Sequence, residues 1–129
     1  MTKNALRFVA SVKEKNLYTE IGNVIFVGDP KETYKLANLY AGENTLTYII
    51  KSSLEIEKIF DFKIIKNSKF VIINEIENAS SELRRLIIST MDELTSTIWV
   101  LTSSSKRIDN RFTLRSAVLD TGLIDLYPA

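Results

Sequence analysis

The fold of this chain is decided by the stretch Asn23-Val24-Ile25-Phe26-Val27-Gly28-Asp29-Pro30. Its first five residues are almost all apolar and predict a strand that is buried on both faces of a sheet. Asp29 then predicts a helix N-cap, Pro30 suits the first helical position, and Glu32 supplies the acid of a capping box. Gly42 predicts the end of that helix. A buried strand followed at once by a capped helix is typical of α/β proteins.

Outside this stretch, short apolar runs alternate with amphipathic segments. Further strands are expected at residues 46–50, 70–73, 98–101 and 123–126. Further helices are expected at residues 6–16, 52–60 and 79–93, where apolar residues recur at helical spacing. Ser52 and Glu55 repeat the capping-box pattern at the start of the second of these helices. The alternation predicts one α/β domain around a mainly parallel sheet, spanning residues 1–129.

The composition is that of a folded protein with no dominant charge. Of the 129 residues, 45% are hydrophobic, and Lys plus Arg outnumber Asp plus Glu by only 17 to 16. A balance this even supplies no overall positive field that would draw the chain to nucleic acid. Because Cys and His are absent, disulfides, thiolate nucleophiles, imidazole bases and the commonest zinc ligands are excluded. With no run long enough to span a bilayer and no signal-peptide core, a cytoplasmic protein without a membrane partner is expected.

Three more motifs follow the first strand in order. The apolar run 70–73 leads into Asn74-Glu75, and the run 98–101, which contains a Trp99 expected in the core, leads into Thr102-Ser103-Ser104. The last motif is Leu114-Arg115-Ser116-Ala117-Val118. In this order the motifs resemble the phosphate loop, Walker B, sensor 1 and Ser-Arg-Cys motifs of AAA+ clamp-loader subunits. The arrangement is similar to the N-terminal domain of the delta prime subunit of bacterial DNA polymerase III.

The resemblance covers roughly residues 5–127 and implies a fold and a role. The fold it implies is a P-loop-NTPase-like parallel sheet of five strands, flanked by helices. The role it implies is participation in loading the ring-shaped sliding clamp during DNA replication. Since the family's helical lid and collar domains are absent from residues 1–129, we expect these residues to form the nucleotide-fold domain alone.

The phosphate-loop position lacks the residues that phosphate binding needs. A working loop has glycines for close backbone approach, a Lys for the phosphates and a Ser or Thr for magnesium. Counted from Gly28, the family spacing places Thr33 at the second glycine, Tyr34 at the lysine and Lys35 at the hydroxyl. Asp29 is expected to accept a hydrogen bond from the N–H group of residue 31 or residue 32, and so to fill the anion position itself. The loop is therefore expected to be degenerate.

The other nucleotide-handling positions also depart from the family. Asn74 stands where Walker B has a magnesium-binding Asp, and Glu75 stands where hydrolysing relatives polarise the attacking water. Thr102-Ser103-Ser104 matches the sensor 1 region. Arg115-Ser116-Ala117 matches the region of the arginine finger, and the finger position itself is Ala117. The delta prime subunits usually keep that arginine, so the chain departs from them here. No catalytic residue, cofactor or metal ligand is expected.

Basic residues gather in two parts of the sequence. They are Arg84 and Arg85 on the expected helix after Walker B, and Lys106, Arg107, Arg111 and Arg115 further on. Related loaders face DNA phosphates with this helix region, so these residues are candidates for weak contacts with the DNA backbone or with a partner. Without interleaved aromatic residues, charges that are solvated or paired at an interface are the favoured interpretation.

Three hypotheses for the function follow. The leading one is a non-hydrolysing structural domain of a DNA polymerase clamp-loader-like complex, with other clamp-loader subunits and the sliding clamp as partners and a monomeric isolated domain. A competing hypothesis is an ATP-binding AAA+ ATPase with an unusual phosphate loop. The third is a receiver-like α/β regulatory domain, in which Asp29 and Asn74-Glu75 would be the acidic cluster at the strand ends.

Overall fold

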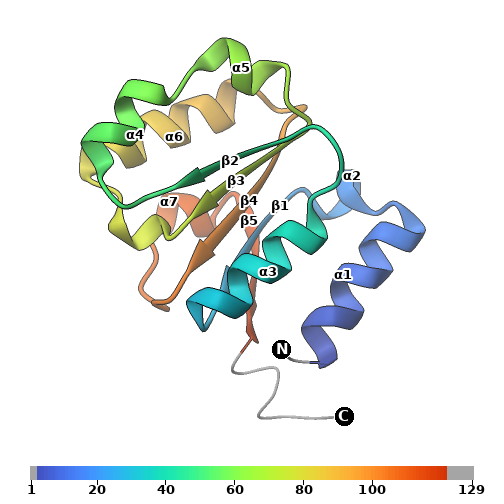
Figure 1. Ribbon diagram of the computed structural model, residues 1–129. Helices are drawn as coiled ribbons and strands as arrows, with labels where there is room; N and C mark the ends of the chain where they lie inside the picture. Colours follow the sequence, from blue (N-terminus) through green and yellow to red (C-terminus); the bar gives the residue numbers. More distant parts are fainter. Residues whose placement is uncertain (1–2, 122–129) are drawn as a thin grey trace.

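One five-stranded sheet forms the centre of the molecule (Figure 1). The computed structural model describes residues 3–121. The strands are β1 (Asn23–Val27), β2 (Thr45–Ile49), β3 (Phe70–Asn74), β4 (Ile98–Ser103) and β5 (Ser116–Asp120). They lie in the order β2-β3-β4-β1-β5, and every neighbouring pair is parallel. The predicted α/β fold with a parallel sheet is confirmed.

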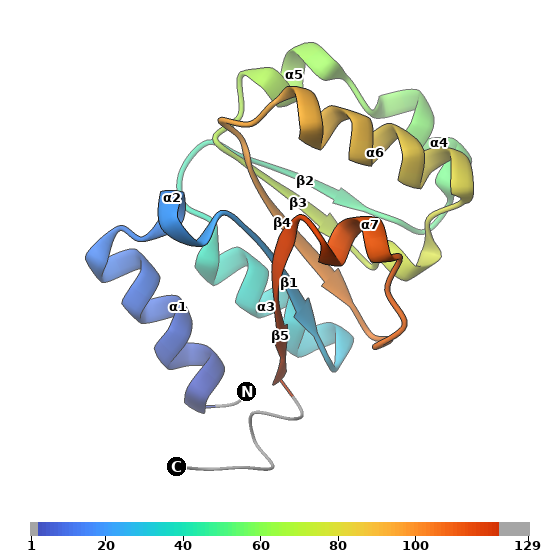
Figure 2. The same cartoon turned by 180° about the vertical axis from the view of Figure 1, so that it is seen from behind.

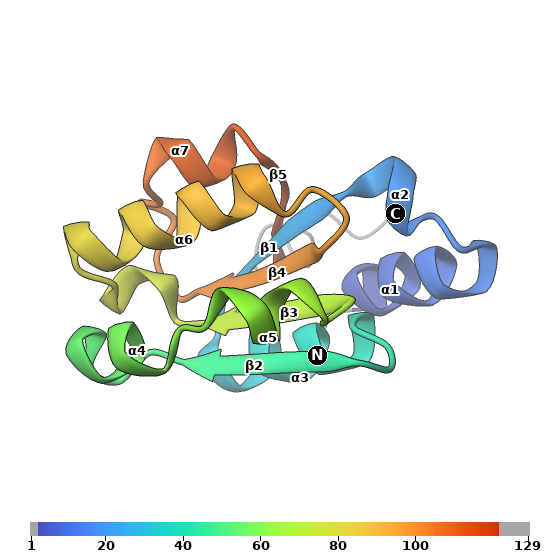
Figure 3. The ribbon, with the colours of Figure 1, turned by 90° about the horizontal axis from the view of Figure 1, so that it is seen from above.

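Helices cover both faces of this sheet. The longer ones are α1 (Lys3–Lys15), α3 (Pro30–Tyr40), α4 (Ser53–Ile59) and α6 (Ser81–Glu93). The shorter ones are α2 (Tyr18–Ile21), α5 (Phe62–Lys66), α7 (Asn110–Thr113) and the 3-10 turn η1 (Ile76–Asn78). Helices α1 and α3 lie on one side of the sheet, and α4, α5 and α6 lie on the other (Figure 1). Helix α7 lies beside α6 when the molecule is seen from behind and from above (Figures 2 and 3).

The side chains of β1 show how the sheet divides the core into two layers. Val24 and Phe26 belong to the apolar cluster under α1 and α3, whereas Ile25 and Val27 belong to the cluster under α4 to α7. All four are buried. Successive side chains of a strand point to opposite faces, so a strand covered on both sides must be apolar throughout. This requirement explains the continuous apolar run in the sequence.

Burial follows the position of each strand in the sheet. Every residue of β3 is buried, and β1 and β4 are buried except for their first residues. Trp99 on β4 is fully buried, as predicted. The edge strands β2 and β5 are mostly half-buried or exposed. The three central strands were therefore the ones with the clearest sequence signal.

Most helix boundaries differ from the sequence-based expectation by a few residues. The first helix covers Lys3–Lys15 rather than 6–16, and the helix after Walker B covers Ser81–Glu93 rather than 79–93. The helix α3 ends at Tyr40 with Ala41 as its C-cap, so it stops directly before Gly42, where the sequence suggested. Ser52 occupies the N-cap of α4 but makes no side-chain cap hydrogen bond, so the predicted capping box there is wrong.

The fifth strand lies earlier in the chain than expected. The prediction placed it at residues 123–126, which lie outside the described residues, whereas the strand that pairs with β1 is Ser116–Asp120. The strand Ser116–Asp120 has polar residues at both ends and half-exposed side chains, so it does not stand out as an apolar run in the sequence. As a result, the segment matched to Ser-Arg-Cys enters an edge strand.

The strand order also excludes one of the three hypotheses for the function. Receiver-like domains have the flavodoxin-like order 2-1-3-4-5. Here β4 lies between β3 and β1, and β1 is not a neighbour of β2. The receiver-like hypothesis is therefore wrong. Among residues 3–121, no helix combines the length and the apolar character needed to cross a membrane.

Candidate functional site

The candidate site lies where β1, β3 and β4 end. The carboxyl ends of parallel strands meet at one edge of a sheet, which is where open α/β sheets bind their ligands. Gly28 follows β1, Asn74 ends β3, and Thr102 and Ser103 end β4. The N–H of Gly28 donates to the carbonyl of Ser103 across 3.0 Å, which ties the first loop to the sensor 1 strand.

The loop between β1 and α3 has only two residues, Gly28 and Asp29. The Asp29 carboxylate accepts hydrogen bonds from the N–H groups of Lys31 and Glu32, each at 3.1 Å. The N–H of Thr33 donates to the carbonyl of Asp29 at 2.9 Å. The predicted cap is confirmed. The free N–H groups that a helix N-terminus offers to an anion are therefore bonded to the chain itself.

Thr121 and Thr33 fill the space next to the Gly28 Cα. Thr121 is buried, and its hydroxyl donates to the carbonyl of Val27 at 2.9 Å. A Cβ atom placed on Gly28 would lie 2.0 Å from Thr121 Oγ1 and 3.7 Å from Thr33 Cγ2. Gly28 also has a φ of 150°, a conformation that L side chains rarely adopt. Gly28 is thus required by the close approach of Thr121, a residue that sequence reasoning did not single out.

The three remaining residues that the sequence matched to the phosphate loop lie on α3 rather than in a loop. Thr33 is buried, and its hydroxyl donates to the carbonyl of Pro30 at 3.2 Å. Tyr34 is half-buried and Lys35 is exposed. Since the helix has already begun at Pro30, the backbone from here on is helical and does not form a cradle.

Asn74, Glu75 and Thr102 form a hydrogen-bonded chain. The Thr102 hydroxyl donates to Asn74 Oδ1 at 2.5 Å and accepts from the N–H of Glu75 at 2.9 Å. Asn74 and Thr102 are buried. Glu75 is in the left-handed region, with a φ of 65° and a ψ of 56°, and is half-buried. The residues matched to the Walker B and sensor 1 motifs thus lie side by side and bond to each other.

The end of β4 makes a second contact with the segment after β3. The N–H of Ser104 donates to a Glu77 carboxylate oxygen at 2.8 Å, and the Ser104 hydroxyl donates to the same oxygen. Ser103 is buried, and its hydroxyl donates to the carbonyl of Ser105 at 2.7 Å. Glu77 is therefore the carboxylate that contacts the sensor 1 region, and a sequence search centred on Glu75 did not identify it.

The segment matched to the arginine finger is fixed by an ion pair to α6. Arg115 Nε and Nη2 donate to the two Asp92 carboxylate oxygens at 2.7 and 2.9 Å, and Nη1 donates to the carbonyl of Arg111 at 2.8 Å. The hydrogen bonds from Arg115 to the carboxylate lower the pKa of Asp92. Ser116 and Ala117 begin β5, where Ala117 is half-buried and pairs with Val24 of β1.

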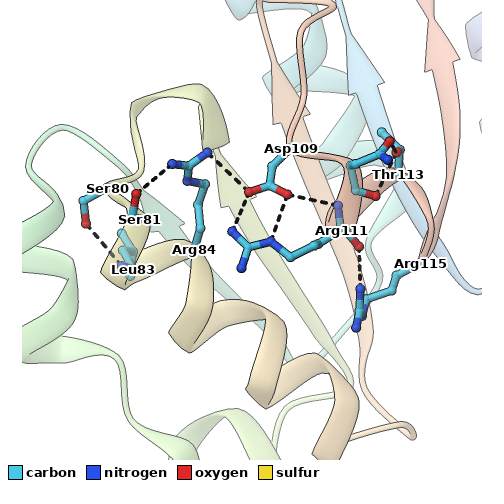
Figure 4. A network of polar contacts seen from close by, with 9 residues as sticks. Ser80, Ser81, Leu83, Arg84, Asp109, Arg111, Thr113 and Arg115 are labelled. Atoms are coloured by element: carbon cyan, nitrogen blue, oxygen red, sulfur yellow. Dashed lines mark hydrogen bonds and ion pairs between the residues drawn. The ribbon is translucent and has the colours of Figure 1, made fainter.

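The basic residues of the second cluster pair mainly with acids of this chain. Asp109 accepts from Arg111 Nε at 3.0 Å and Nη2 at 2.7 Å, and from Arg84 Nη1 at 3.3 Å (Figure 4). The hydrogen bonds from Arg111, with the added charge of Arg84, lower the pKa of Asp109 to about 2. Lys106 Nζ lies 3.2 Å from Asp120 Oδ2. These cations therefore pair with acids inside the chain, whereas the sequence favoured charges that are solvated or paired at an interface.

Two of the basic candidates stand apart from this network. Arg85 and Arg107 are exposed, and neither forms an ion pair within residues 3–121. The acids that pair with the other cations, Asp92, Asp109 and Asp120, were not singled out from the sequence, because each lies far along the chain from a partner it meets only in the fold. The described part of the chain brings no group of three acids together in a way that could hold a metal ion.

The sheet order and the position of the site define an α/β domain of the P-loop-NTPase type. Three solved structures share this fold. RuvB from Thermotoga maritima aligns with a TM-score of 0.62 and 17% identity, over 92% of this chain and 43% of that one. The DNA polymerase III gamma subunit-related protein of the same organism aligns with a TM-score of 0.59 and 12% identity, over 87% of this chain and 45% of that one. PCH-2 from C. elegans aligns with a TM-score of 0.56 and 19% identity, over 91% and 41%.

These similar structures are all AAA+ proteins, so the expected AAA+ arrangement of the fold is confirmed. The chain spans less than half the length of each of them. The sequence matches no protein-family model and no curated protein.

Proposed function

We propose that this chain is a non-hydrolysing structural domain of a clamp-loader-like complex, which acts in DNA replication through protein–protein contacts. The observation that carries the proposal is the start of α3 at Pro30, directly after Gly28-Asp29, with the Asp29 carboxylate on its first N–H groups. The order of the motifs and the likeness to a DNA polymerase III gamma subunit-related protein support the choice of a clamp-loader-like complex among AAA+ assemblies.

Electrostatics at the helix mouth disfavours nucleotide phosphates. A phosphate would have to displace the Asp29 carboxylate from two N–H groups and approach a second acid, Glu32, in the first turn. Tyr34 supplies no positive charge at the lysine position. Magnesium would meet the neutral amide of Asn74, whose oxygen already accepts from Thr102. Each part of a phosphate–magnesium site is therefore replaced or occupied.

The same reasoning applies to a neighbour's nucleotide. An arginine finger stabilises the charge that develops on the transferred phosphoryl group. In this chain the finger position is Ala117, and the nearby Arg115 is held by both carboxylate oxygens of Asp92. We infer that the domain contacts an adjacent subunit without contributing an arginine to that subunit's nucleotide site. Any contact with a DNA backbone rests on Arg85 and Arg107, because the other basic candidates are paired with acids.

A phosphate-release assay separates this proposal from the competing ATPase hypothesis. The purified chain with ATP and magnesium should release phosphate at the rate of the buffer blank. Asn74→Asp should not restore turnover, because the phosphate and magnesium contacts of such a site act as a unit. Turnover by either protein above the blank would favour the ATPase hypothesis.

The partner-binding part of the proposal has its own test. Alone, the chain should elute as a monomer by size-exclusion chromatography with light scattering. Mixed with the clamp-loader subunits of its own organism, it should co-elute with them whether or not ATP is present. Elution as a separate monomer from that mixture would contradict the structural role even if the chain proves unable to hydrolyse ATP.

A further inference from the structure

Strand β2 leaves one edge of the sheet open. It is the last strand in the sheet order, and within residues 3–121 its only strand partner is β3 (Figure 3). Proteins usually protect such an edge with a charged residue, a proline or a bulge. The β2 sequence Thr-Leu-Thr-Tyr-Ile has neither a charged residue nor a proline, and its pairing with β3 runs without a bulge from Thr45 to Ile49. The edge is therefore able to pair with another strand.

The hydrogen bonds between β2 and β3 show which backbone groups face outward. The N–H of Ile50 and the carbonyl of Asn44 both bond to β3, at 3.1 and 3.3 Å. Backbone groups of an edge strand point alternately toward its neighbour and away from it. The N–H and C=O groups of Thr45, Thr47 and Ile49 therefore point away from β3. The side chains of Thr47 and Ile49 are also exposed, so the outer edge offers both backbone groups and β-branched side chains.

Opposite charges lie at equal distances on either side of Thr47. Glu43 precedes Thr47 by four positions, Lys51 follows it by four, and both are exposed. Neither forms an ion pair within residues 3–121. If two β2 strands pair antiparallel with Thr47 opposite Thr47, then Glu43 of each chain lies opposite Lys51 of the other. The edge is therefore complementary in charge to a second copy of itself.

We propose that β2 pairs antiparallel with β2 of a second copy of this chain, about a two-fold axis at Thr47. Thr47 of each copy exchanges N–H···O=C bonds with Thr47 of the other, and Thr45 bonds with Ile49 in the same way. The carbonyl of Ile49 also accepts from the N–H of Lys51 at 3.1 Å, and its second lone pair serves the copy. The proposal goes beyond the proposed function and does not depend on the loss of nucleotide binding.

Other arrangements of the two strands lose the charge match. A parallel pair in register would place Glu43 beside Glu43 and Lys51 beside Lys51. An antiparallel pair shifted by two residues would place Glu43 opposite Ile49 and would leave Lys51 beyond the end of the other strand. Like charges that face each other across strands are destabilising. The charges at the ends of β2 therefore select the antiparallel register centred on Thr47.

The contact is small, so the dimer is weak. A single short strand and its flanking charges bury less than the roughly 1,200–2,000 Å² of a stable interface. We expect a dissociation constant on the order of 1 mM. At the micromolar concentrations of a sizing column the chain is then a monomer, as the structural role requires.

Sedimentation equilibrium from micromolar to millimolar concentration tests the pairing. The original chain should approach a dimer at the upper end of this range. Glu43→Lys and Lys51→Glu should each raise the dissociation constant roughly tenfold or more, because each places like charges opposite one another at both ends of the strand pair. An equimolar mixture of these two variants should associate as the original chain does, since opposite charges then meet at both ends.

The control is a charge reversal outside the edge. Lys15→Glu changes an exposed residue at the end of α1 and should leave the association unchanged. Amide NMR of the isotope-labelled original chain should show concentration-dependent shifts at Thr45, Thr47 and Ile49. A chain that stays monomeric at millimolar concentration would overturn the proposal. Association that both single variants retain, or a mixture of the two that fails to associate, would also overturn it.

Discussion

Thr102 on β4 donates its hydroxyl to Asn74 Oδ1 at the end of β3 across 2.5 Å. The two side chains are those that the sequence matched to the sensor 1 and Walker B motifs, and they bond to each other directly. The same hydroxyl accepts the N–H of Glu75, whose left-handed backbone turns the chain into η1. The polar groups at the ends of β3 and β4 therefore bond to one another and help to maintain the fold at this edge of the sheet.

Replacing Thr102 by Val should destabilise the protein by about 1–3 kcal/mol, because it leaves the buried Asn74 oxygen and the Glu75 N–H without their partner. Thr47→Val is the matched control, since Thr47 is exposed on the edge strand β2 and should change stability little. Urea denaturation of both variants gives the comparison. Equal midpoints for Thr102→Val and Thr47→Val would show that the hydrogen-bonded chain contributes no stability.

Asp29→Ala should cost about 1 kcal/mol, the typical loss for an N-cap whose side chain bonds to two N–H groups. Asp29→Asn should retain most of the stability, because Asn caps helices as well as Asp does. The pair separates the cap from the charge in a denaturant melt. An unchanged midpoint for Asp29→Ala would contradict the role of Asp29 as the group that satisfies the helix.

Gly28→Ala should destabilise the protein by about 1–3 kcal/mol through its backbone conformation alone, and the overlap with Thr121 Oγ1 should add to that cost. Adding Thr121→Ala should recover part of the loss, since the Thr121 Cβ is 3.4 Å from the new methyl group and is tolerable there. Thermal melts of the single and double variants measure the recovery. Strictly additive effects would show that the two residues do not compete for this space.

Acid should weaken the fold in a window set by Asp109. The pKa of this carboxyl is lowered from 3.8 to about 2 by its arginine partners, so its ionised form is favoured in the folded protein. The stabilisation is complete above pH 3.8 and is lost as the pH falls through about 2. Asp109→Asn should therefore flatten this acid limb in melts recorded between these pH values. An acid limb identical to that of the original protein would contradict the assignment.

The features predicted correctly from sequence are those set by neighbouring residues or by complete burial. Asp29 and Pro30 specify the start of α3 because capping involves only the next few residues. Strand β3 was recognisable because every one of its residues is buried. The short helices α5 and α7 were missed, since five and four residues carry too little periodicity to be distinguished from loops.

The contacts that close the candidate site could not be predicted from sequence, because they join distant parts of the chain. Thr121 meets the carbonyl of Val27 across 94 positions of sequence. Arg115 and Asp92 are 23 positions apart, and nothing in their local sequence distinguishes this pair from other exposed charges. Strand β5 has polar residues at both ends and lies at an edge, so only its pairing with β1 identifies it.

We propose that Asp29, by accepting from the first N–H groups of α3, fills the place where an anion could otherwise bind. Isothermal titration of ATP with magnesium into the purified chain tests it most directly, with Asp29→Asn as a second sample. Neither protein should give binding heat above dilution, because removing one charge leaves the cap in place and Tyr34 at the lysine position. Micromolar binding of ATP to the original chain would contradict the claim.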